Sequence, residues 1–268
     1  MLERSLGHLY TLDELGRRDT PLGRIDARVK VLVVLWLLLV LASFGPHQLG
    51  RPLPLVLFLV LGFVLGDVPV RLVATRVLVA SPFALLVGIW NPLIDSSPLW
   101  RVGPVMFSAG WVSFLSILLR FILGLTAVLL LVATTGFGAT CTALRRLGVP
   151  RSLTTQLVLL YRYSFVLVGE VARTVRAHAL RAPERPRPTL GTAKSLLGEL
   201  LLRTLGRAER VHAAMLCRGF DGSLELGARA RLRVADLGFL VGWCAFFAGV
   251  RAWDVPGWLG QLVTSGAP

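Results

Sequence analysis

The sequence predicts an all-α, polytopic membrane protein with about five transmembrane helices and a cytoplasmic region of long amphipathic helices. The first reason is composition: of 268 residues, 54% are hydrophobic and only 16% are charged, and the mean hydropathy is +0.69. A soluble domain of this size carries about 25% charged residues. The second reason is a series of apolar runs close to membrane length. The third is the uneven placement of the basic residues along the chain.

The basic residues gather in the segments that would lie on one side of a membrane. Of 29 Lys and Arg, six lie in residues 1–30 and seventeen in 141–233, whereas three fall in the segments that we place outside. This is the positive-inside pattern of a bacterial-type inner membrane protein, and it predicts a cytoplasmic N-terminus. It also explains much of the net charge of +14. Nucleic acid is the weaker interpretation, because the basic run lacks interleaved aromatic residues and a recognition motif.

The apolar runs give the order of the predicted spans. The second run is short for a crossing of roughly 20 residues, and the third contains Pro82, which predicts a kink. An outer loop is expected over 91–110, ahead of the clearest span. Five spans place the C-terminus outside the cytoplasm, although the weak second and third runs leave four or six open. The predicted spans cover about residues 29–44, 53–66, 73–90, 111–135 and 236–253.

These spans divide the chain into four regions. Residues 1–28 are a polar lead-in, in which no cleavable signal peptide is expected because no short apolar stretch precedes a small-residue cleavage site. Residues 29–135 hold the first four spans, 136–233 form the cytoplasmic region, and 234–268 hold the last span and a tail. The three cysteines are widely spaced, which argues against a disulfide framework.

Two long helices are predicted within the cytoplasmic region. The first begins at Pro150 and Ser152 and is stopped by the prolines that start at Pro183. The second begins near Thr189 and ends at Gly219 and Gly222, residues that favour a left-handed helix end. Each helix is too charged to span a bilayer and carries one apolar stripe, so we expect both to pack against the rest of the protein at or below the membrane.

Each of these helices ends in a pair of Ala and Arg residues four positions apart. Ala177 precedes Arg181 in the first helix, and Ala214 precedes Arg218 and Gly219 in the second. A single Arg at a helix C-terminus can simply complement the helix dipole or contact lipid phosphate. Two copies of the Ala–Arg pair in one region favour docking of another protein. A guanidinium can bind carboxylates or carbonyls through bidentate hydrogen bonds, and the small Ala lets a partner surface approach closely.

Arg120 lies within the fourth predicted span, about nine residues from its outer end. A charge inside a membrane is costly, so this side chain should face a bundle interior, a polar cavity or a partner. Two interpretations stay open: a contact with another helix or subunit, and an Arg that reaches back to the membrane interface.

The motifs of the common enzyme classes are missing from the sequence. The four His residues form no metal-binding spacing, no G-x-S-x-G nucleophile elbow is present, and Gly191-Thr-Ala-Lys194-Ser195 lacks the glycines of a phosphate-binding loop. An enzyme acting on a phosphorylated lipid or prenyl substrate stays the alternative, although it would need acidic metal ligands. A secondary transporter would need inverted repeats, whereas the two sides of this chain are unlike.

The sequence resembles the CbiQ/EcfT family, whose members are the transmembrane scaffolds of energy-coupling factor importers. The resemblance covers nearly the whole chain and includes the 24–30 stretch Arg-Ile-Asp-Ala-Arg-Val-Lys, Leu119-Arg120 and Tyr161-Arg162-Tyr163. The stretch 214–220 is similar to the second Ala-Arg-Gly signature of the family. The first signature is expected at 177–182, where Ala182 stands in place of Gly.

The resemblance implies a non-catalytic subunit of a larger importer. Two ATPase subunits, which bind ATP and Mg²⁺, would each receive one Arg-tipped coupling helix, and a small membrane subunit would capture the substrate. This chain would bind no cofactor or metal itself, and it would transmit ATP-driven movement through residues Ala177, Arg181, Ala214, Arg218 and Gly219. The pattern is closer to the CbiQ branch, which implies uptake of cobalt or nickel rather than of a vitamin, and a link to cobalamin biosynthesis.

Overall fold

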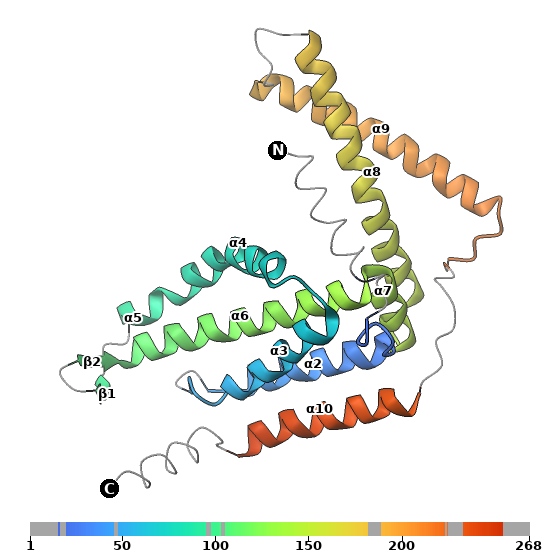
Figure 1. Ribbon diagram of the computed structural model, residues 1–268. Helices are drawn as coiled ribbons and strands as arrows, with labels where there is room; N and C mark the ends of the chain where they lie inside the picture. Colours follow the sequence, from blue (N-terminus) through green and yellow to red (C-terminus); the bar gives the residue numbers. More distant parts are fainter. Residues whose placement is uncertain are drawn as a thin grey trace, which may run out of the picture. The chain divides into compact units, whose positions relative to one another are not determined.

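The computed structural model describes most of the chain and divides it into two compact units (Figure 1). The described residues up to Gly136, together with residues 233–253, form what we call the bundle unit. The described residues from Phe137 to Leu224 form what we call the crossed-helix unit. The described residues are 16, 20–45, 48–94, 98–102, 105–181, 189–222, 224 and 233–253.

The bundle unit is helical except for one hairpin of two antiparallel strands. Helices were predicted at all five of its apolar runs, and each run is helical in the structure. The loop expected over 91–110 is a partial error, since it contains a short helix and the hairpin, whose strands are rich in β-branched and aromatic residues. The elements are α2 (Ala27–Ser43), η1 (Leu53–Leu55), α3 (Val56–Gly66), α4 (Val70–Gly88), α5 (Trp90–Ile94), β1 (Pro98–Val102), β2 (Val105–Ser108), α6 (Ala109–Thr135) and α10 (Val234–Ala252).

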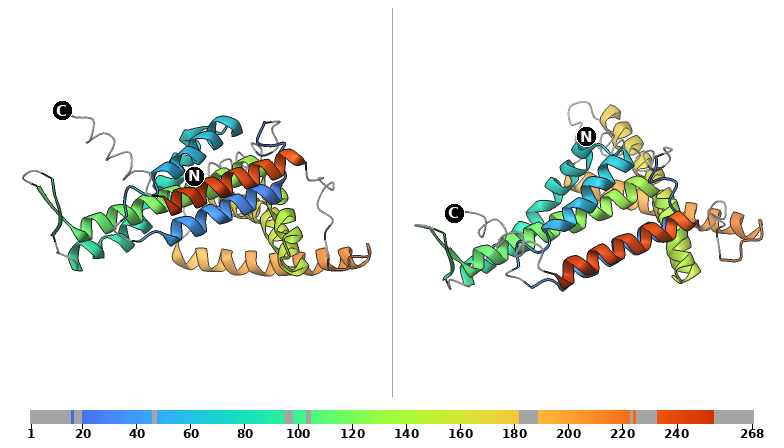
Figure 2. Two further views of the ribbon diagram at one scale, coloured as in Figure 1. Left: turned by 90° about the horizontal axis from the view of Figure 1, so that it is seen from below. Right: turned by 60° about the horizontal axis from the view of Figure 1, so that its bottom comes forward.

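Helix α2 lies at the centre of the bundle core. It is apolar on all its faces beyond the first turn, and a helix of that kind is expected to be surrounded by others. Val33 and Leu37 are almost completely buried, and α10 and α6 pack on either side. Figure 2 shows α2 and α10 side by side. Next to them the ring of Phe58 makes edge contacts with Trp243 and Phe247, at centroid distances of 4.8 and 5.4 Å.

Three helices among the described residues are long and apolar enough to cross a membrane: Val70–Pro92, Gly110–Thr135 and Val234–Ala252. The apolar segment Leu53–Gly66 is shorter. Helix α2 has 17 residues, which is about 26 Å of helix against a hydrocarbon core of about 30 Å. Leu78 and Val79 on α4 are 72% and 77% exposed, as expected of side chains that face lipid.

The crossed-helix unit consists of α7 (Phe137–Arg146), α8 (Arg151–Arg181) and α9 (Leu190–Leu216). The last two agree with the two helices predicted from sequence. Gly148, with a φ of 104°, ends α7 and turns the chain into α8, a conformation that glycine adopts without strain. Phe137 at the start of α7 stacks on Tyr161 of α8 with ring centroids 4.3 Å apart. Thr189 caps α9, accepting a hydrogen bond from the N–H of Thr192.

Candidate functional site

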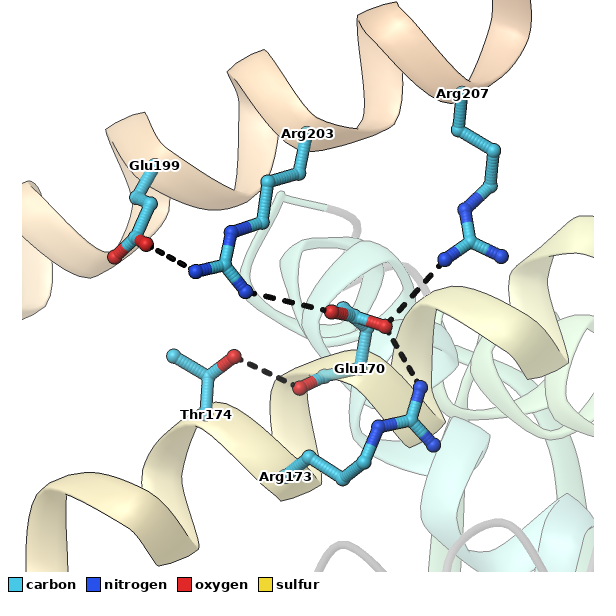
Figure 3. A network of polar contacts seen from close by, with 6 residues as sticks. All are labelled: Glu170, Arg173, Thr174, Glu199, Arg203 and Arg207. Carbon is cyan, nitrogen blue, oxygen red and sulfur yellow. Dashed lines mark hydrogen bonds and ion pairs between the residues drawn. The ribbon is translucent and has the colours of Figure 1, made fainter. Parts of the chain in front are cut away.

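Helices α8 and α9 cross, and the carboxylate of Glu170 lies at the crossing (Figure 3). Arg173, one turn further along α8, donates a hydrogen bond of 2.7 Å to Oε2 of Glu170. Two arginines of α9 reach the same carboxylate, Arg203 at 3.7 Å from Oε1 and Arg207 at 3.7 Å from Oε2. Arg203 also pairs with Glu199 of its own helix. Glu170 therefore links the two long helices through charge.

The surroundings of Glu170 favour its ionised form. Its side chain is only 18% exposed. The hydrogen bond from Arg173 is the largest cause that holds the pKa of Glu170 below its ordinary value near 4.5. Desolvation opposes it, and the charges of Arg173, Arg207 and Arg203 lower the pKa further. One carboxylate is thus shared by three guanidinium groups, and the positive charge that remains keeps it ionised at neutral pH.

Beside the crossing, the first half of α8 and the second half of α9 enclose a largely apolar groove of about 480 Å³. Leu160 and Tyr163 line it from α8, and Ala208 and Met215 line it from α9. Because early residues of α8 face late residues of α9, the helices run in roughly opposite directions on this side of the crossing. Phe220, just beyond α9, also lines the groove.

Each predicted Arg lies at the far end of its own helix. Arg181 is the last residue of α8, and Arg218 follows the last turn of α9; both are exposed. Arg181 lies 11 residues beyond Glu170, and Arg218 lies 11 residues beyond Arg207. With a rise of 1.5 Å per residue, each arm from the crossing to its Arg is about 16 Å long. The unit therefore presents two arms of similar length, each ending in an exposed Arg.

The end of α9 is fixed by a glycine-based turn. Gly219 has a φ of 79°, and the N–H of Phe220 donates to the carbonyl of Met215 at 3.0 Å. This pattern is the Schellman motif, which satisfies the last carbonyls of a helix and requires a left-handed residue that glycine adopts at little cost. Gly222 has a φ of 89°. Both glycines confirm the helix end that the sequence predicted.

The chain beyond Arg218 is tied back to the base of the unit. The hydroxyl of Thr155, in the first turns of α8, donates to the carbonyl of Gly222 at 3.2 Å. Arg145 of α7 donates to the carbonyl of Leu224 at 2.8 Å. Two hydrogen bonds thereby anchor the chain shortly after Arg218. The corresponding stretch after Arg181, including Ala182 and the stop predicted at Pro183, lies outside the described residues.

The structure exposes every residue predicted for docking and does not bring the two pairs together. Ala177 and Arg181 lie on α8, and Ala214 and Arg218 lie at the end of α9 with Gly219. Their role in coupling to another protein stays a prediction. Sequence reasoning missed Glu170, although it is the one acidic residue of the 31-residue α8. A single carboxylate in an Arg-rich helix could have indicated that Glu170 pairs with arginines.

Arg120, in the bundle unit, completes the C-terminal end of α2. Its guanidinium donates to the carbonyl of Phe44 at 2.9 Å, to the carbonyl of Gly45, and to the hydroxyl of Ser116 at 2.9 Å. Carbonyls at a helix end lack partners within the helix, and a guanidinium can satisfy several at once. This charge thus has partners within its own chain, and a contact with another subunit stays a prediction.

No group of three or more His, Cys, Asp or Glu side chains that could hold a metal ion occurs in the part of the chain that the structure describes. Cys141 is buried in the crossed-helix unit, and burial raises the pKa of its thiol, so it is a poor thiolate donor.

Comparison with known proteins points to transport. A family model described as CbiQ, cobalt transport protein, matches residues 18–227. A protein of Methanocorpusculum labreanum, named as a fused cobalt transport protein CbiMQ, is 24% identical over 225 residues, 77% of this chain and 36% of that protein. An uncharacterized protein of Methanocaldococcus jannaschii is 29% identical over 114 residues, 40% of this chain and 38% of that protein. The chain thus spans little more than a third of the length of these two relatives.

Proposed function

Because the chain belongs to the CbiQ family of cobalt transport proteins, we propose that it is the transmembrane coupling subunit of an energy-coupling factor importer. In this role it transmits the movement of two ATPase subunits to a small membrane subunit that binds the substrate. ATP and Mg²⁺ are bound by the ATPases, and this chain binds no cofactor. It is a transport component rather than an enzyme.

The observation that carries the proposal is the pair of arms in the crossed-helix unit. Each arm extends about 16 Å from the crossing, as judged from a rise of 1.5 Å per residue, and ends in an exposed Arg. Two separate tips suit two ATPase subunits, each offering a groove with carboxylates or carbonyls to a guanidinium. Linkage of both arms at Glu170 means that displacement of one tip acts on the other.

The mechanism follows from this geometry. When ATP binding brings the two ATPases together, the tips at Arg181 and Arg218 change their separation, and the helices rotate about the Glu170 crossing. Long contacts of 3.7 Å from Arg203 and Arg207 to one carboxylate suit such a rotation, because a guanidinium can slide over the two oxygens without losing the ion pair. The bundle unit then shifts, and the substrate subunit reorients.

The proposed topology places the helix tips with the ATPases in the cytoplasm. Five spans, α2, the η1–α3 segment, α4, α6 and α10, cross the inner membrane, with the N-terminus inside and the C-terminus outside. The family points to cobalt as the substrate, with nickel as the second candidate. The name of the Methanocorpusculum labreanum relative supports a separate M-type membrane partner that captures the metal.

Co-purification and uptake test the proposal. The chain is expressed with the ATPase and membrane-subunit genes of its source, extracted in mild detergent, and reconstituted into vesicles with ATP on the cytoplasmic side. We expect two nucleotide-binding subunits and one small membrane protein to co-purify, and labelled Co²⁺ to accumulate only with ATP. Turnover of a phosphorylated lipid or prenyl substrate by the chain alone would instead support the membrane enzyme.

A further inference from the structure

Three charged side chains are buried together at one end of the bundle unit. Asp26, Lys30 and Asp236 are 7%, 5% and 2% exposed, and they are the buried charged residues among those that the structure describes. Burial of a charge costs several kcal/mol unless the group is paired and hydrogen-bonded. The proposed mechanism above gives these residues no task.

Hydrogen bonds from this cluster join the ends of three helices. Oδ1 of Asp236 accepts from the N–H of Asp26 at 3.0 Å, and its Oδ2 accepts from the N–H of Arg233 at 2.7 Å. The ammonium of Lys30 donates to the carbonyl of Thr134 at 3.1 Å. The N-termini of α2 and α10 and the C-terminus of α6 are thereby connected, although their residues lie more than 100 positions apart in sequence.

Each charge also has the sign that its helix end favours. The carboxylates of Asp26 and Asp236 lie at the N-termini of α2 and α10, where the helix dipole is positive. The ammonium of Lys30 lies at the C-terminus of α6, where the dipole is negative and the last carbonyls lack partners. The three charges therefore compensate one another and their helix ends, although Oδ2 of Asp26 is buried without a hydrogen-bond partner. Arg28 also lies near Asp26, with its Nε 3.9 Å from Oδ1. Removal of Lys30 would leave the two carboxylates buried without its ammonium.

The position of the cluster in the chain suggests its task. Thr134 lies two residues before Gly136, where the chain leaves the bundle unit, and Arg233 is the N-cap of α10, at the start of the described part of its return. The same three charges hold the last turn of α6 and the first turn of α10. A pull from the crossed-helix unit must therefore act on residues that these charges hold together.

We propose that Asp26, Lys30 and Asp236 form a clamp that fixes the exit and the return of the crossed-helix unit, so that its displacement moves the bundle unit instead of fraying α6 and α10. This inference rests on the proposed coupling function. Lys30 and Asp236 are positioning residues, since neither is expected to touch ATPase or substrate. A buried ion cluster is weak evidence for stability, because apolar replacements of similar size are often as stable.

The two lysines of the chain supply a matched pair of variants. Lys30→Met removes the central charge of the clamp and keeps the length of the side chain, whereas Lys194→Met makes the same change at an exposed position on α9. Each variant is reconstituted with its partners, and three quantities are measured: Co²⁺ taken up per ATP hydrolysed, thermal unfolding of the complex, and backbone hydrogen exchange over residues 130–136 and 233–240.

For Lys30→Met we expect an assembled complex that still hydrolyses ATP, a fall of about fivefold or more in uptake per ATP, and faster exchange in both segments. A coupling free energy of about 1 kcal/mol corresponds to that factor. Lys194→Met should match the wild type. A purely structural role would lower the unfolding temperature and leave the uptake per ATP of the assembled complexes unchanged, which would overturn the proposal.

Two further outcomes are decisive. If Lys30→Met does not assemble, the double variant Lys30→Met/Asp236→Asn, which removes one charge of each sign, takes its place; failure of both to assemble makes the cluster a folding requirement and overturns the clamp. If the wild-type complex shows no ATP-dependent uptake, the proposed function fails by itself. Hydrogen exchange still tests the clamp in that case, and unchanged exchange in the variant would refute it.

Discussion

At the scale of single residues, charge placement distinguishes the two units. In the crossed-helix unit the arginines at the helix tips are exposed and available to a partner, whereas Glu170 draws three arginines into contacts within the chain. In the bundle unit Arg120 is used to complete the end of α2. Arginines thus end both long helices at exposed positions, whereas other arginines make contacts within the chain, at Glu170 and at the end of α2.

The charge of Arg218 can be tested by reversal. Arg218→Glu would put a carboxylate into a partner groove suited to a cation, and an Arg at the centre of an interface typically contributes about 2 kcal/mol or more, about thirtyfold in affinity. We expect loss of the ATPases on purification, or ATP hydrolysis without uptake. Arg210→Glu, at an exposed position of the same helix, is the control. Normal assembly and transport by Arg218→Glu would rule out docking at this tip.

Glu170 makes the crossing sensitive to acid. Its pKa is lower in the folded protein than its ordinary value near 4.5, so its stabilising charge is fully present above that value and is lost as pH falls through the lowered pKa. Glu170→Gln should remove this dependence and loosen the crossing at neutral pH. Pulsed EPR between spin labels on α8 and α9 measures the distance distribution. An identical narrow distribution for wild type and variant from pH 7 to pH 3 would contradict the assignment.

At the scale of elements, the long helices have defined ends. Gly148 turns α7 into α8, Thr189 begins α9, and Gly219 ends it. The position of a helix end matters here because it sets the length of the arm and the direction of its Arg. The second tip is further held by the hydrogen bonds of Thr155 and Arg145, so its geometry depends on the turn as much as on the helix.

Two glycine substitutions test whether the turn at Gly219 positions Arg218. Gly219→Ala places a side chain at a φ of 79°, which costs about 1–2 kcal/mol for an L-residue, so we expect faster hydrogen exchange at 214–220 and weaker ATPase binding. Gly198→Ala lies inside α9 with open space around its Cβ and should stabilise the helix by roughly 1 kcal/mol. Equal binding by both variants would show that the turn does not position Arg218.

At the scale of the whole molecule, the two units differ in composition. The bundle unit has a largely apolar core built around α2 and many exposed apolar side chains. The crossed-helix unit has amphipathic helices, an apolar groove and Arg-rich surfaces. The composition of the bundle unit suits the hydrocarbon core of a bilayer, whereas the charged helices of the crossed-helix unit do not.

The proposed topology predicts that the ends of the chain lie on opposite sides of the membrane. Reporter fusions after residue 268 and before residue 1, read with one enzyme active in the cytoplasm and one active outside it, measure this directly. Five spans give a cytoplasmic signal at the N-terminus and an outside signal at the C-terminus. Signals on the same side would establish an even number of spans, such as four or six, and would overturn the five-span topology.

The sequence by itself determined where the five apolar and the two long amphipathic helices lie and where α9 ends, whereas the short helices α5 and α7 were not predicted. The periodicity of apolar residues and the positions of proline and glycine are local properties of the sequence. The five apolar helices, the two long amphipathic helices and the turn at Gly219 could therefore all be predicted. The hairpin at 98–108 was missed, because short apolar strands resemble loops when flanked by Gly, Pro and Ser. The exposed Ala and Arg pairs were found because they repeat within one region.

Only the tertiary structure decided which distant charges meet. Glu170 with Arg203 and Arg207, Arg120 with the end of α2, and Asp26 with Asp236 are separated by 33 to 210 positions. Sequence periodicity shows which face of a helix is apolar. It carries no information on which other helix packs against that face, or on how far along the axis the two helices meet. That choice is made by packing and by the need to give each buried polar group a partner. Polar contacts between elements therefore become visible only once the helices are assembled.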